Sequence, residues 1–307
     1  MPLRFIQRAC PVCDSSAHRE LFRKETLCLV CCDECAMIFA SPIEEGLATG
    51  AFYDQLATPF YLSPDKVEGD YSPVRFAREL KLFLEFCQRG SVLDVGCSTG
   101  AFLHQLQTRY PADYEVTGMD VAGPALDYAE KKGVRVLRES YLNKDFHGQT
   151  FSAVTFWAVM EHLVSPRDFL ARTADVLEPS GFCFVLVPNF QSLAVRLLGK
   201  KYRYILPQHV NYFTRATLRQ LVNTEPRFKI VYSGSTHFNP LVIWQDWRRR
   251  GKPVSDEDRA KLLKRTTGYK QNPFLKPLKL ILAGAEAGLK RWHLADNLVV
   301  VLQKIAT

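Results

Sequence analysis

The sequence predicts a doubly wound α/β fold with a mostly parallel, seven-stranded sheet, preceded by a small zinc-binding ribbon. Three observations carry this prediction. Strand-like and helix-like segments alternate after about residue 90, a glycine-bearing turn follows the first of these strands, and paired cysteines stand close to the N-terminus. We expect a ribbon over residues 1–41, an aromatic-rich linker or lid over 42–73, and the α/β domain over 74–307 with a basic helical insertion at 237–296.

The composition of the chain is that of an ordinary globular protein. Of its 307 residues, 47% are hydrophobic and 23% are charged. No apolar run reaches the roughly 18 residues that a membrane span requires, and the first residues lack the apolar stretch of a secretory signal. We therefore expect a cytoplasmic protein whose nine cysteines bind metal or fill space instead of forming disulfides.

Four N-terminal cysteines have the spacing of a zinc site. They form two C-x2-C pairs separated by eighteen residues, so that two knuckle turns can place four thiolates around one Zn²⁺. A site closed by four thiolates leaves no position for substrate and is structural. The predicted ligands are Cys10, Cys13, Cys32 and Cys35.

A second C-x2-C pair, Cys28 and Cys31, overlaps this pattern, so either residue could replace one of the four ligands. We prefer Cys32 and Cys35 because residues 27–30 have the pattern of a strand entering the second knuckle and residues 36–39 that of a strand leaving it. Buried free thiols and a redox site are the alternatives to zinc.

The linker combines chain-breaking prolines with aromatic residues. Its aromatic side chains could close over a pocket or pack the ribbon against the main domain, and the sequence favours neither interpretation. The residues concerned are Pro42, Phe52, Tyr53, Pro59, Phe60, Tyr61, Pro64, Tyr71 and Pro73.

The α/β domain begins with a helix over 74–87, which Gly90 ends. A short apolar strand, a turn and a second helix over 101–110 follow. The remaining alternation predicts a parallel sheet with helices on both faces. Strands are expected at 114–120, 134–138, 151–157, 181–188, 228–233 and 297–304, and helices at 124–132, 166–177 and 217–223.

The turn after the first strand is where a doubly wound fold binds its cofactor. The dinucleotide pattern G-x-G-x-x-G fails here, because Ser98 and Ala101 stand where it requires glycine. The chain also lacks the G-x-x-x-x-G-K-[ST] phosphate loop. An acidic residue before the turn, Asp94, suits a cofactor that carries an ammonium group and repels a pyrophosphate.

The segment Asp94–Gly100, DVGCSTG, resembles the D-x-G-x-G-x-G motif of class I S-adenosylmethionine-dependent methyltransferases, with Ser98 in place of the middle glycine. Residues 151–163 are similar to the fourth strand of that family and the loop after it, and residues 177–181 resemble its L-x-P-G-G turn. The resemblance covers about residues 74–236 and the last strand. It implies a Rossmann-like methyltransferase fold and a methyl-transferring enzyme that uses S-adenosylmethionine.

The resemblance also implies a cofactor site at the ends of the strands. Asp120 would hold the ribose hydroxyls with both carboxylate oxygens, whereas Cys97 is expected to be a small filler within the loop. The implied cofactor-binding residues are Asp94, Gly96, Cys97, Ser98, Gly100, Asp120, Val121 and Trp157.

Candidate bases lie on two loops beyond strand ends. Glu161 and His162 follow the fourth strand, and His209 and Tyr212 lie between the fifth strand and the next helix. A base would remove the proton of a hydroxyl or carbon acid as the methyl group is transferred, and histidine titrates in a suitable range. For each of these residues a purely structural role is the alternative.

A zinc ribbon followed by this domain is similar to the layout of bacterial sugar C-methyltransferases. Those enzymes carry a further C-terminal α/β domain, and this chain has no segment of that size. We therefore expect a small-molecule acceptor, with methylation at a hydroxyl or carbon of a sugar, a nucleotide-linked sugar or a natural product.

The segment from Arg248 to Arg291 holds thirteen basic and four acidic residues, so its surplus of nine positive charges exceeds the net charge of +8 of the whole chain. Within it, residues 277–292 have the pattern of an amphipathic helix, with Ile281, Leu282 and Ala285 on its apolar side and Glu286 on its polar side. The insertion is a solvated cap, a cover that offers charge to an anionic substrate, or a contact surface for RNA or an acidic membrane.

Two other functions remain open at this point. An rRNA base methyltransferase with a zinc ribbon would account for the basic segment, but residues 157–160 do not form the Asn/Asp-Pro-Pro-Tyr type motif of many such enzymes. A non-catalytic binding module with a methyltransferase-like fold is the alternative from another class, and it would not bind S-adenosylmethionine.

Overall fold

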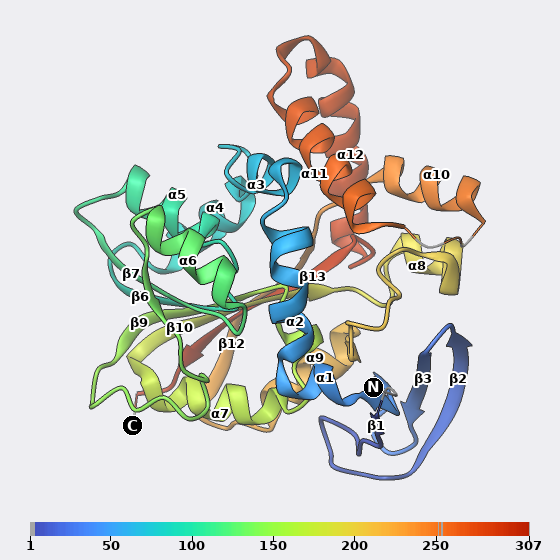
Figure 1. The fold of residues 1–307 in the computed structure, drawn as a ribbon, viewed down its shortest axis with the longest axis horizontal. Helices are drawn as coiled ribbons and strands as arrows, with labels where there is room; N and C mark the ends of the chain where they lie inside the picture. Colours follow the sequence, from blue (N-terminus) through green and yellow to red (C-terminus); the bar gives the residue numbers. More distant parts are fainter. Residues whose placement is uncertain (1–3, 251, 253, 307) are drawn as a thin grey trace.

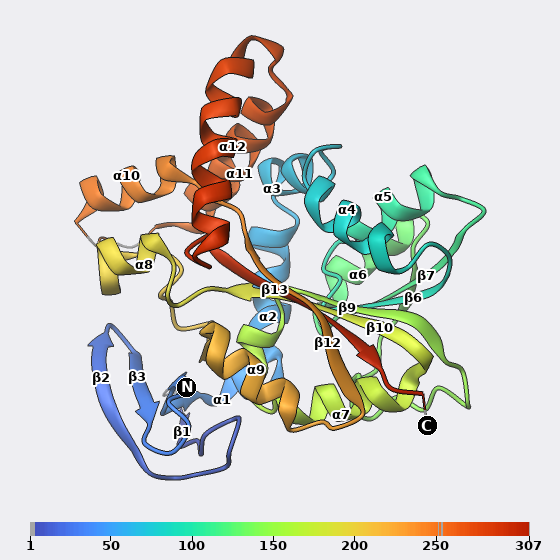
Figure 2. The ribbon, with the colours of Figure 1, turned by 180° about the vertical axis from the view of Figure 1, so that it is seen from behind.

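The computed structural model describes residues 4–250, 252 and 254–306, so the predicted domain limits at residues 1 and 307 lie outside the described part. A twisted sheet forms the middle layer of the molecule (Figure 1). Helices α4, α5 and α6 cover one face of this sheet, and α7 and α9 cover the other (Figures 1 and 2). The N-terminal ribbon lies at one side, and a helical hairpin projects from the body.

The main sheet has seven strands in the order β12-β13-β10-β9-β6-β7-β8. Neighbours from β10 to β8 pair in parallel, whereas β13 runs antiparallel to both β10 and β12. The prediction of a mostly parallel, seven-stranded sheet is therefore confirmed. The strands are β6 (Gly90–Val95), β7 (Tyr114–Met119), β8 (Arg135–Leu137), β9 (Phe151–Trp157), β10 (Leu177–Pro188), β12 (Phe228–Thr236) and β13 (Asn297–Lys304).

The helices of the α/β domain agree with the predicted ones to within a few residues. Strand β10 begins four residues before the predicted start at Gly181, and its pairing with β9 shifts register between Leu177 and Phe182. Residues 177–181, which resemble a turn in the sequence, belong to the strand in the structure and form a bulge in it. The helices are α4 (Ala77–Phe86), α5 (Ala101–Arg109), α6 (Gly123–Lys131), η2 (Met160–His162), α7 (Pro166–Val176), α8 (Leu193–Leu198), η3 (Gly199–Lys201) and α9 (Arg215–Asn223).

The core lies on both faces of this sheet, because its strands are apolar along their whole length. Side chains alternate between the faces. In β9, Phe156 packs in the core under α7 and α9, whereas Ala153 packs with Phe83 of α4 and Phe102 of α5. The two layers of helices thus hold the strand ends in fixed positions.

The ribbon shares a sheet with the α/β domain. The sheet of the ribbon has the order β11-β4-β3-β2, and its strand β11 comes from the α/β domain. This strand is two residues long and pairs antiparallel with β4. A further pair, β1 with β5, extends the ribbon to residue 44, three residues beyond its predicted end. The strands are β1 (Phe5–Ile6), β2 (His18–Lys24), β3 (Leu27–Cys32), β4 (Ile38–Ala40), β5 (Ile43–Glu44) and β11 (Asn211–Tyr212).

The linker and the insertion pack against each other. Lys264 pairs with Asp65 at 2.9 Å across the two segments, and Gly69 leaves room for Leu263, which lies 2.8 Å from the place where a Cβ would stand. No helix in the described part of the chain is both long and apolar enough to span a bilayer. The helices are α1 (Glu45–Thr49), α2 (Ala51–Leu56), η1 (Ala57–Tyr61), α3 (Pro64–Asp70), α10 (Pro240–Arg249), α11 (Asp256–Gln271), η4 (Pro273–Leu275) and α12 (Lys276–Arg291).

The predicted faces of the last helix, α12, need correction. Glu286, expected on the solvated side, is buried, and its carboxylate accepts hydrogen bonds of 2.5 and 2.7 Å from Arg78 of α4. Ile281, expected on the apolar inner side, is exposed. The helix exists where predicted. The face that carries Glu286 turns inward, where this residue pairs with Arg78, which is far away in the sequence.

Arg8 joins the ribbon to the α/β domain. Its guanidinium is buried and donates hydrogen bonds to the carbonyl oxygens of Val164 and Val210 and to the side chain of Asn211, at 2.9 to 3.0 Å. Burial lowers the pKa of Arg8 to about 10, so it stays charged at neutral pH. One side chain thus satisfies acceptors on two separate loops.

Replacing Arg8 by methionine should destabilise the protein by about 2–3 kcal/mol, because the buried acceptors lose their donor. Urea unfolding measures the effect. The matched control is Arg19→Met, since Arg19 pairs with Asp33 on the surface and its loss should change the unfolding free energy much less than the loss of Arg8 does. Equal unfolding free energies for Arg8→Met and the unmodified protein would contradict this account of the interface.

Candidate functional site

The predicted cofactor residues meet at the carboxyl edge of the sheet. Parallel strands end at the same edge, so the turn after β6 lies beside the ends of β7 and β9. The backbone amides of Gly96 and Cys97 both donate to the carbonyl oxygen of Met119, at 2.7 and 3.0 Å. These two bonds attach the turn to the last residue of β7.

The turn has a left-handed residue at every second position. Gly96, Ser98 and Gly100 have φ values of +77°, +50° and +74°. A Cβ on Gly96 would lie 2.5 Å from Val159, and one on Gly100 would lie 2.8 Å from Ala129, so glycine is required at both. Ser98 takes the same conformation as the glycine it replaces, with some strain.

Asp94 lies beneath the turn and not on its surface. Its side chain is buried and accepts a 2.6 Å hydrogen bond from the hydroxyl of Thr155 on β9. Burial raises the pKa of Asp94 to about 7, against the opposing effect of the Thr155 bond. A carboxyl group that titrates near neutrality, directly below the turn, can respond to a positively charged group placed above it.

Asp120 closes the turn from the end of β7. One carboxylate oxygen accepts the amide of Ser98 at 2.8 Å, and the other accepts the amide of Ala122 at 2.9 Å. Each oxygen keeps a lone pair for a further donor. Burial raises the pKa of Asp120, and the two backbone amides act in the opposite direction. Cys97 is buried against Gly118 of β7, which agrees with its expected role as filler.

The linker lies over the same edge. Gly50 contacts Val121, whose side chain remains 57% exposed, and the carboxylate of Asp54 accepts the amide of Gly123 at 3.0 Å. Tyr61 packs against the start of α6. The aromatic segment therefore covers the region around Asp120, as the lid interpretation predicts, and it also packs the ribbon side of the molecule against the domain.

Three of the four predicted bases form one buried cluster. A carboxylate oxygen of Glu161 and ring nitrogens of His162 and His209 lie within 4.8 Å of one another, a grouping that could also hold a metal ion. His162 Nδ1 donates to the carbonyl oxygen of Gln208 at 2.8 Å, and the hydroxyl of Tyr53 from the linker lies 3.0 Å from the same nitrogen. The sequence did not indicate a contribution of the linker to this cluster.

The cluster carries little charge at neutral pH. Burial raises the pKa of Glu161 to about 8 and lowers that of His162 to about 4. The pKa of His209 falls well below its usual value, first by burial and then by the charges of His162 and Arg259. One oxygen of Glu161 and Nδ1 of His209 are buried without a hydrogen-bond partner, so the cluster can accept a further polar group.

Tyr212, the fourth predicted base, has its hydroxyl engaged elsewhere. The hydroxyl donates to the carbonyl oxygen of Leu206 at 2.9 Å and lies 3.2 Å from the amide of the same residue. The side chain is buried. In this arrangement Tyr212 fixes the loop before β11 and offers no free group.

A second group of polar residues combines Trp157, which the resemblance assigns to the cofactor site, with Glu79 and Ser235, which the sequence did not indicate. A cavity of about 190 Å³ opens at the carboxyl edge and is lined by Glu79 of α4, Trp157 of β9 and Ser235 of β12, among others. Each of these three has a buried polar side-chain atom without a partner. The other oxygen of Glu79 lies 3.2 Å from His237. Glu79 falls within an ordinary helical pattern, so no local signal marks it.

The four predicted zinc ligands also come together. The sulfur atoms of Cys10, Cys13, Cys32 and Cys35 lie within 4.8 Å of one another, and all four thiols are free. The amide of Asp14 donates to the carbonyl oxygen of Cys10 at 3.0 Å, as the amide of Ala36 donates to that of Cys32 at 3.1 Å, so the two knuckles are alike.

The competing cysteines point elsewhere. The thiol of Cys28 donates to the carboxylate of Glu20, and that of Cys31 to the carbonyl oxygen of Cys32, both at 3.6 Å. The structure thus groups Cys32 and Cys35 with Cys10 and Cys13, and it leaves Cys28 and Cys31 outside this group.

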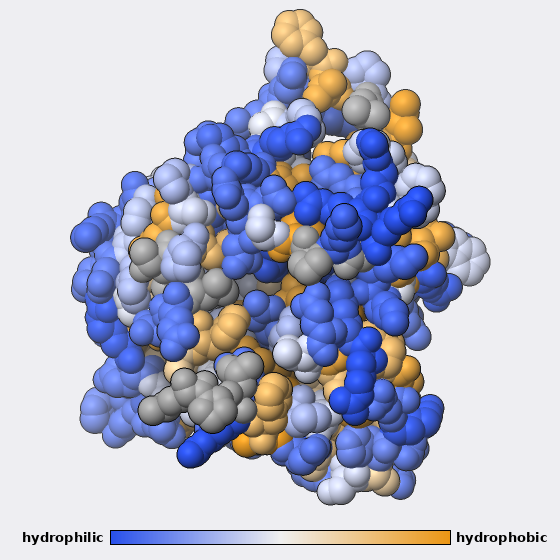
Figure 3. Space-filling view, turned by 45° about the vertical axis from the view of Figure 1, so that its right-hand side comes forward, coloured by the Kyte–Doolittle hydropathy of each residue, from blue (hydrophilic) through white to orange (hydrophobic). Residues whose placement is uncertain are grey.

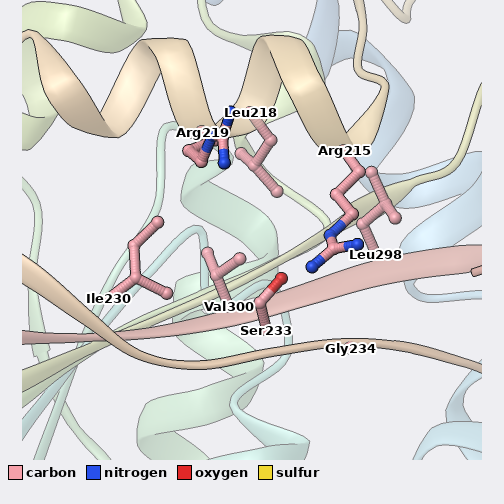
Figure 4. A pocket seen from close by; sticks show the side chains of 8 residues that line it. All are labelled: Arg215, Leu218, Arg219, Ile230, Ser233, Gly234, Leu298 and Val300. Carbon is pink, nitrogen blue, oxygen red and sulfur yellow. The ribbon is translucent and has the colours of Figure 1, made fainter.

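Another cavity, of about 200 Å³, lies between α9 and the strands β12 and β13 (Figure 4). Arg215 extends from α9 toward Ser233 across its mouth. None of the predicted site residues in the described part of the chain lines this cavity, so it is separate from the carboxyl edge.

Comparisons with known proteins match the region that forms this edge. The family described as "Methyltransferase domain" matches residues 70–225. The ubiquinone biosynthesis O-methyltransferase of Shewanella halifaxensis is 27% identical over 149 residues, which cover 44% of this chain and 62% of that protein. The protein of the same name from Photobacterium profundum is 24% identical over 195 residues, covering 57% and 81%. The match thus spans less than two thirds of the first of these relatives.

Among solved structures, the N-methyltransferase NodS of Bradyrhizobium japonicum, in complex with S-adenosylhomocysteine, is similar over 82% of this chain and 97% of its own. The sequences are 12% identical over this alignment, and the TM-score is 0.48.

The raised pKa of Asp94 predicts a pH-dependent effect of Asp94→Asn on stability. The folded protein prefers the protonated carboxyl, so this side chain stabilises the fold below about pH 4 and loses that contribution as the pH rises through about 7. Asparagine keeps an acceptor for Thr155 without the charge. The variant should therefore be more stable than the unmodified protein by roughly 2–4 kcal/mol at pH 8.

Urea unfolding at pH 5 and pH 8 measures the difference, which should be smaller at the lower pH. Asp113→Asn serves as the control, because Asp113 is exposed in a loop. A variant of Asp94 that is less stable than the unmodified protein at pH 8 would show that the carboxylate is held charged in the fold.

Proposed function

The chain belongs to the methyltransferase domain family, and from this premise we propose that it transfers the methyl group of S-adenosylmethionine to a small molecule. The observation that carries the proposal is the turn from Gly96 to Gly100, which faces the carboxylate of Asp120 within the matched region. A turn of left-handed residues brings backbone close to a ligand, and the neighbouring acid suits ribose hydroxyls.

The residues present fit this cofactor. The hydroxyl of Ser98 is buried without a partner, and both oxygens of Asp120 retain acceptor capacity. Asp94 below the turn has a pKa of about 7, so a cationic ammonium group above it would favour the charged carboxylate. Val121 and the linker residue Gly50 border the region beside Asp120, where a flat apolar group can lie.

When bound, S-adenosylmethionine supplies a methyl group on a positively charged sulfur, which a nucleophile attacks without further activation of the leaving group. The remaining task of the protein is to position the acceptor, which contributes much of the rate, and to accept its proton. His209 and His162 are neutral at pH 7 because burial lowers their pKa values, so both are in the unprotonated form that a base requires. The Tyr53 hydroxyl, 3.0 Å from Nδ1 of His162, orients that imidazole.

The cavity beside Trp157, which neither histidine lines, would hold a further part of the acceptor in this proposal. The indole N–H is a donor without a partner and Glu79 offers an unpartnered acceptor oxygen, so an acceptor with hydroxyl groups would satisfy both. The names of the curated relatives, which are O-methyltransferases, support a hydroxyl as the methylated group. A sugar, a nucleotide-linked sugar or a hydroxylated natural product satisfies these requirements.

We further propose that the N-terminal cysteines bind one structural Zn²⁺. Four thiols that converge from two matching knuckles are the donor set this metal prefers. Burial raises the pKa of Cys32, but the amides of Cys35 and Glu34 outweigh this effect, and its pKa is lowered overall. Such amide bonds support thiolate ligands. The metal would hold the ribbon, and with it β4 and Arg8, against the α/β domain.

Changing Asp120 to alanine should lower the affinity for S-adenosylmethionine and S-adenosylhomocysteine at least ten-fold, because the ribose hydroxyls lose their acceptor. Isothermal titration calorimetry measures both ligands. The control is Asp127→Ala, since Asp127 lies on the exposed face of α6, where it pairs with Arg138.

The same protein should release S-adenosylhomocysteine when it is incubated with S-adenosylmethionine and a panel of phenols, sugars and nucleotide-linked sugars. Ribosomal RNA is included as a competing acceptor. Failure to bind either ligand would refute the proposed function, and methylation of RNA alone would assign the acceptor to another class.

The zinc proposal predicts one Zn²⁺ per chain, measured by mass spectrometry of the metal after gel filtration. Cys32→Ser should abolish binding and lower the melting temperature, because the site is closed by four thiolates. Cys31→Ser is the matched control, since the Cys31 thiol donates to the carbonyl oxygen of Cys32 and lies outside the group of four sulfur atoms. Zinc retained by Cys32→Ser but lost from Cys31→Ser would reverse the ligand assignment.

A further inference from the structure

The projecting end of the hairpin formed by α11, η4 and α12 exposes large apolar side chains. We call residues 265–281 the hairpin tip. Phe274 is 89% exposed, Leu280 74% and Ile281 69%. Hydrophobic side chains appear together at this end, above a mostly hydrophilic surface (Figure 3). Isolated apolar side chains on a surface are common, but a group of this kind at the end of a projection marks a contact surface.

The same tip is strongly basic. No acidic residue occurs between Arg259 and Ala285, whereas the tip alone contains Arg265, Lys270, Lys276 and Lys279. Among the described residues, Arg265 takes part in no ion pair, and Lys279 donates only to two backbone carbonyl oxygens. Lys270 also makes no ion pair with a described residue, but it faces Glu79 and Glu286 on the body of the protein.

The bases nearer the body of the protein are neutralised. Arg259 pairs with Asp256, Lys261 with Glu257, and Lys264 with Asp65. Within the described part of the hairpin tip, Arg265 and Lys279 make no ion pair, and the exposed apolar side chains belong to the same segment. Positive charge and exposed apolar side chains therefore occur in the same segment, although different residues contribute them.

We propose that the hairpin tip docks onto a membrane surface that contains anionic lipids. Phe274, Leu280 and Ile281 would enter the boundary between headgroups and acyl chains, and the neighbouring lysines and arginines would lie among the negative headgroups. Such a bilayer offers negative headgroups to the basic side chains and acyl chains to the apolar side chains. This proposal concerns a surface outside the carboxyl edge and does not depend on the proposed methyl transfer.

Charge argues against the other occupants. In a second copy of the chain, the same tip would bring unneutralised positive charges together, which opposes self-association. RNA would neutralise the lysines and arginines but would leave Leu280 and Ile281 in water. The inner face of the helix is already used by the ion pair of Glu286 with Arg78, so the exposed face is not required for folding.

Co-sedimentation of the full chain with vesicles tests the proposal. Vesicles of phosphatidylcholine with about one third phosphatidylglycerol should bind at least ten-fold more tightly than pure phosphatidylcholine, and added salt should weaken the binding. The double substitution Leu280→Gln with Ile281→Gln should reduce binding to the anionic vesicles at least ten-fold, and Arg265→Gln with Lys270→Gln should weaken both the binding and its salt dependence.

The matched control is Leu197→Gln, because Leu197 is 63% exposed on α8, away from the tip; its vesicle binding should be unchanged. Circular dichroism and thermal unfolding check that the variants fold. Equal binding to neutral and anionic vesicles, or unaltered binding by the Leu280 and Ile281 variant, would overturn the proposal. The proposal would also be overturned if the unmodified chain did not bind vesicles and the tip variants abolished RNA binding or dimerisation.

Discussion

The parallel pairing of β6 with both β7 and β9 is the constraint on which the rest of this protein depends. Because these strands end at one edge, the turn at Gly96, the carboxylate of Asp120 and the indole of Trp157 meet there, although they are far apart in the chain. The turn is then fixed by backbone bonds to Met119 and by the two amides that Asp120 accepts. No part of this arrangement requires a flexible loop to find its place. A rigid frame of this kind supplies the positioning that methyl transfer needs.

The segments outside the sheet are attached to this edge by few but specific contacts. Strand β11 of the α/β domain pairs with β4 of the ribbon, and the guanidinium of Arg8 donates hydrogen bonds to backbone carbonyl oxygens on two loops. The linker places the hydroxyl of Tyr53 beside His162, and the hydroxyl of Tyr71 donates to the carbonyl oxygen of Thr99 in the cofactor turn. The insertion in turn packs on the linker through Lys264. Ribbon, linker and insertion are thus linked by contacts to one another and to the residues at the carboxyl edge.

The carboxyl edge also holds polar groups that cost stability in the free protein. Asp94 and Glu161 are buried with raised pKa values, and Glu79, Trp157 and His209 carry buried atoms without partners. Each such group opposes folding. Their concentration at one edge therefore marks this edge as a binding site. The same reasoning separates this edge from the hairpin tip. There the unusual residues are exposed, and the cost is apolar surface in water, which a membrane would remove.

The sequence by itself determined the features that depend on local spacing. The two C-x2-C pairs identified the thiols that converge, the DVGCSTG segment located the turn of left-handed residues after β6, and the alternation of apolar segments predicted the sheet and its helices, because each signal lies within a few residues. Only the tertiary structure decided that the thiols of Cys28 and Cys31 lie outside the group of four, that the Tyr212 hydroxyl binds the backbone of Leu206, and that Glu79 and Trp157 line one cavity. It also decided which face of α12 is buried, since Arg78 stands 208 positions before its partner Glu286. Contacts over such separations leave no periodic trace in the chain, because they depend on how finished elements pack and not on how each element forms.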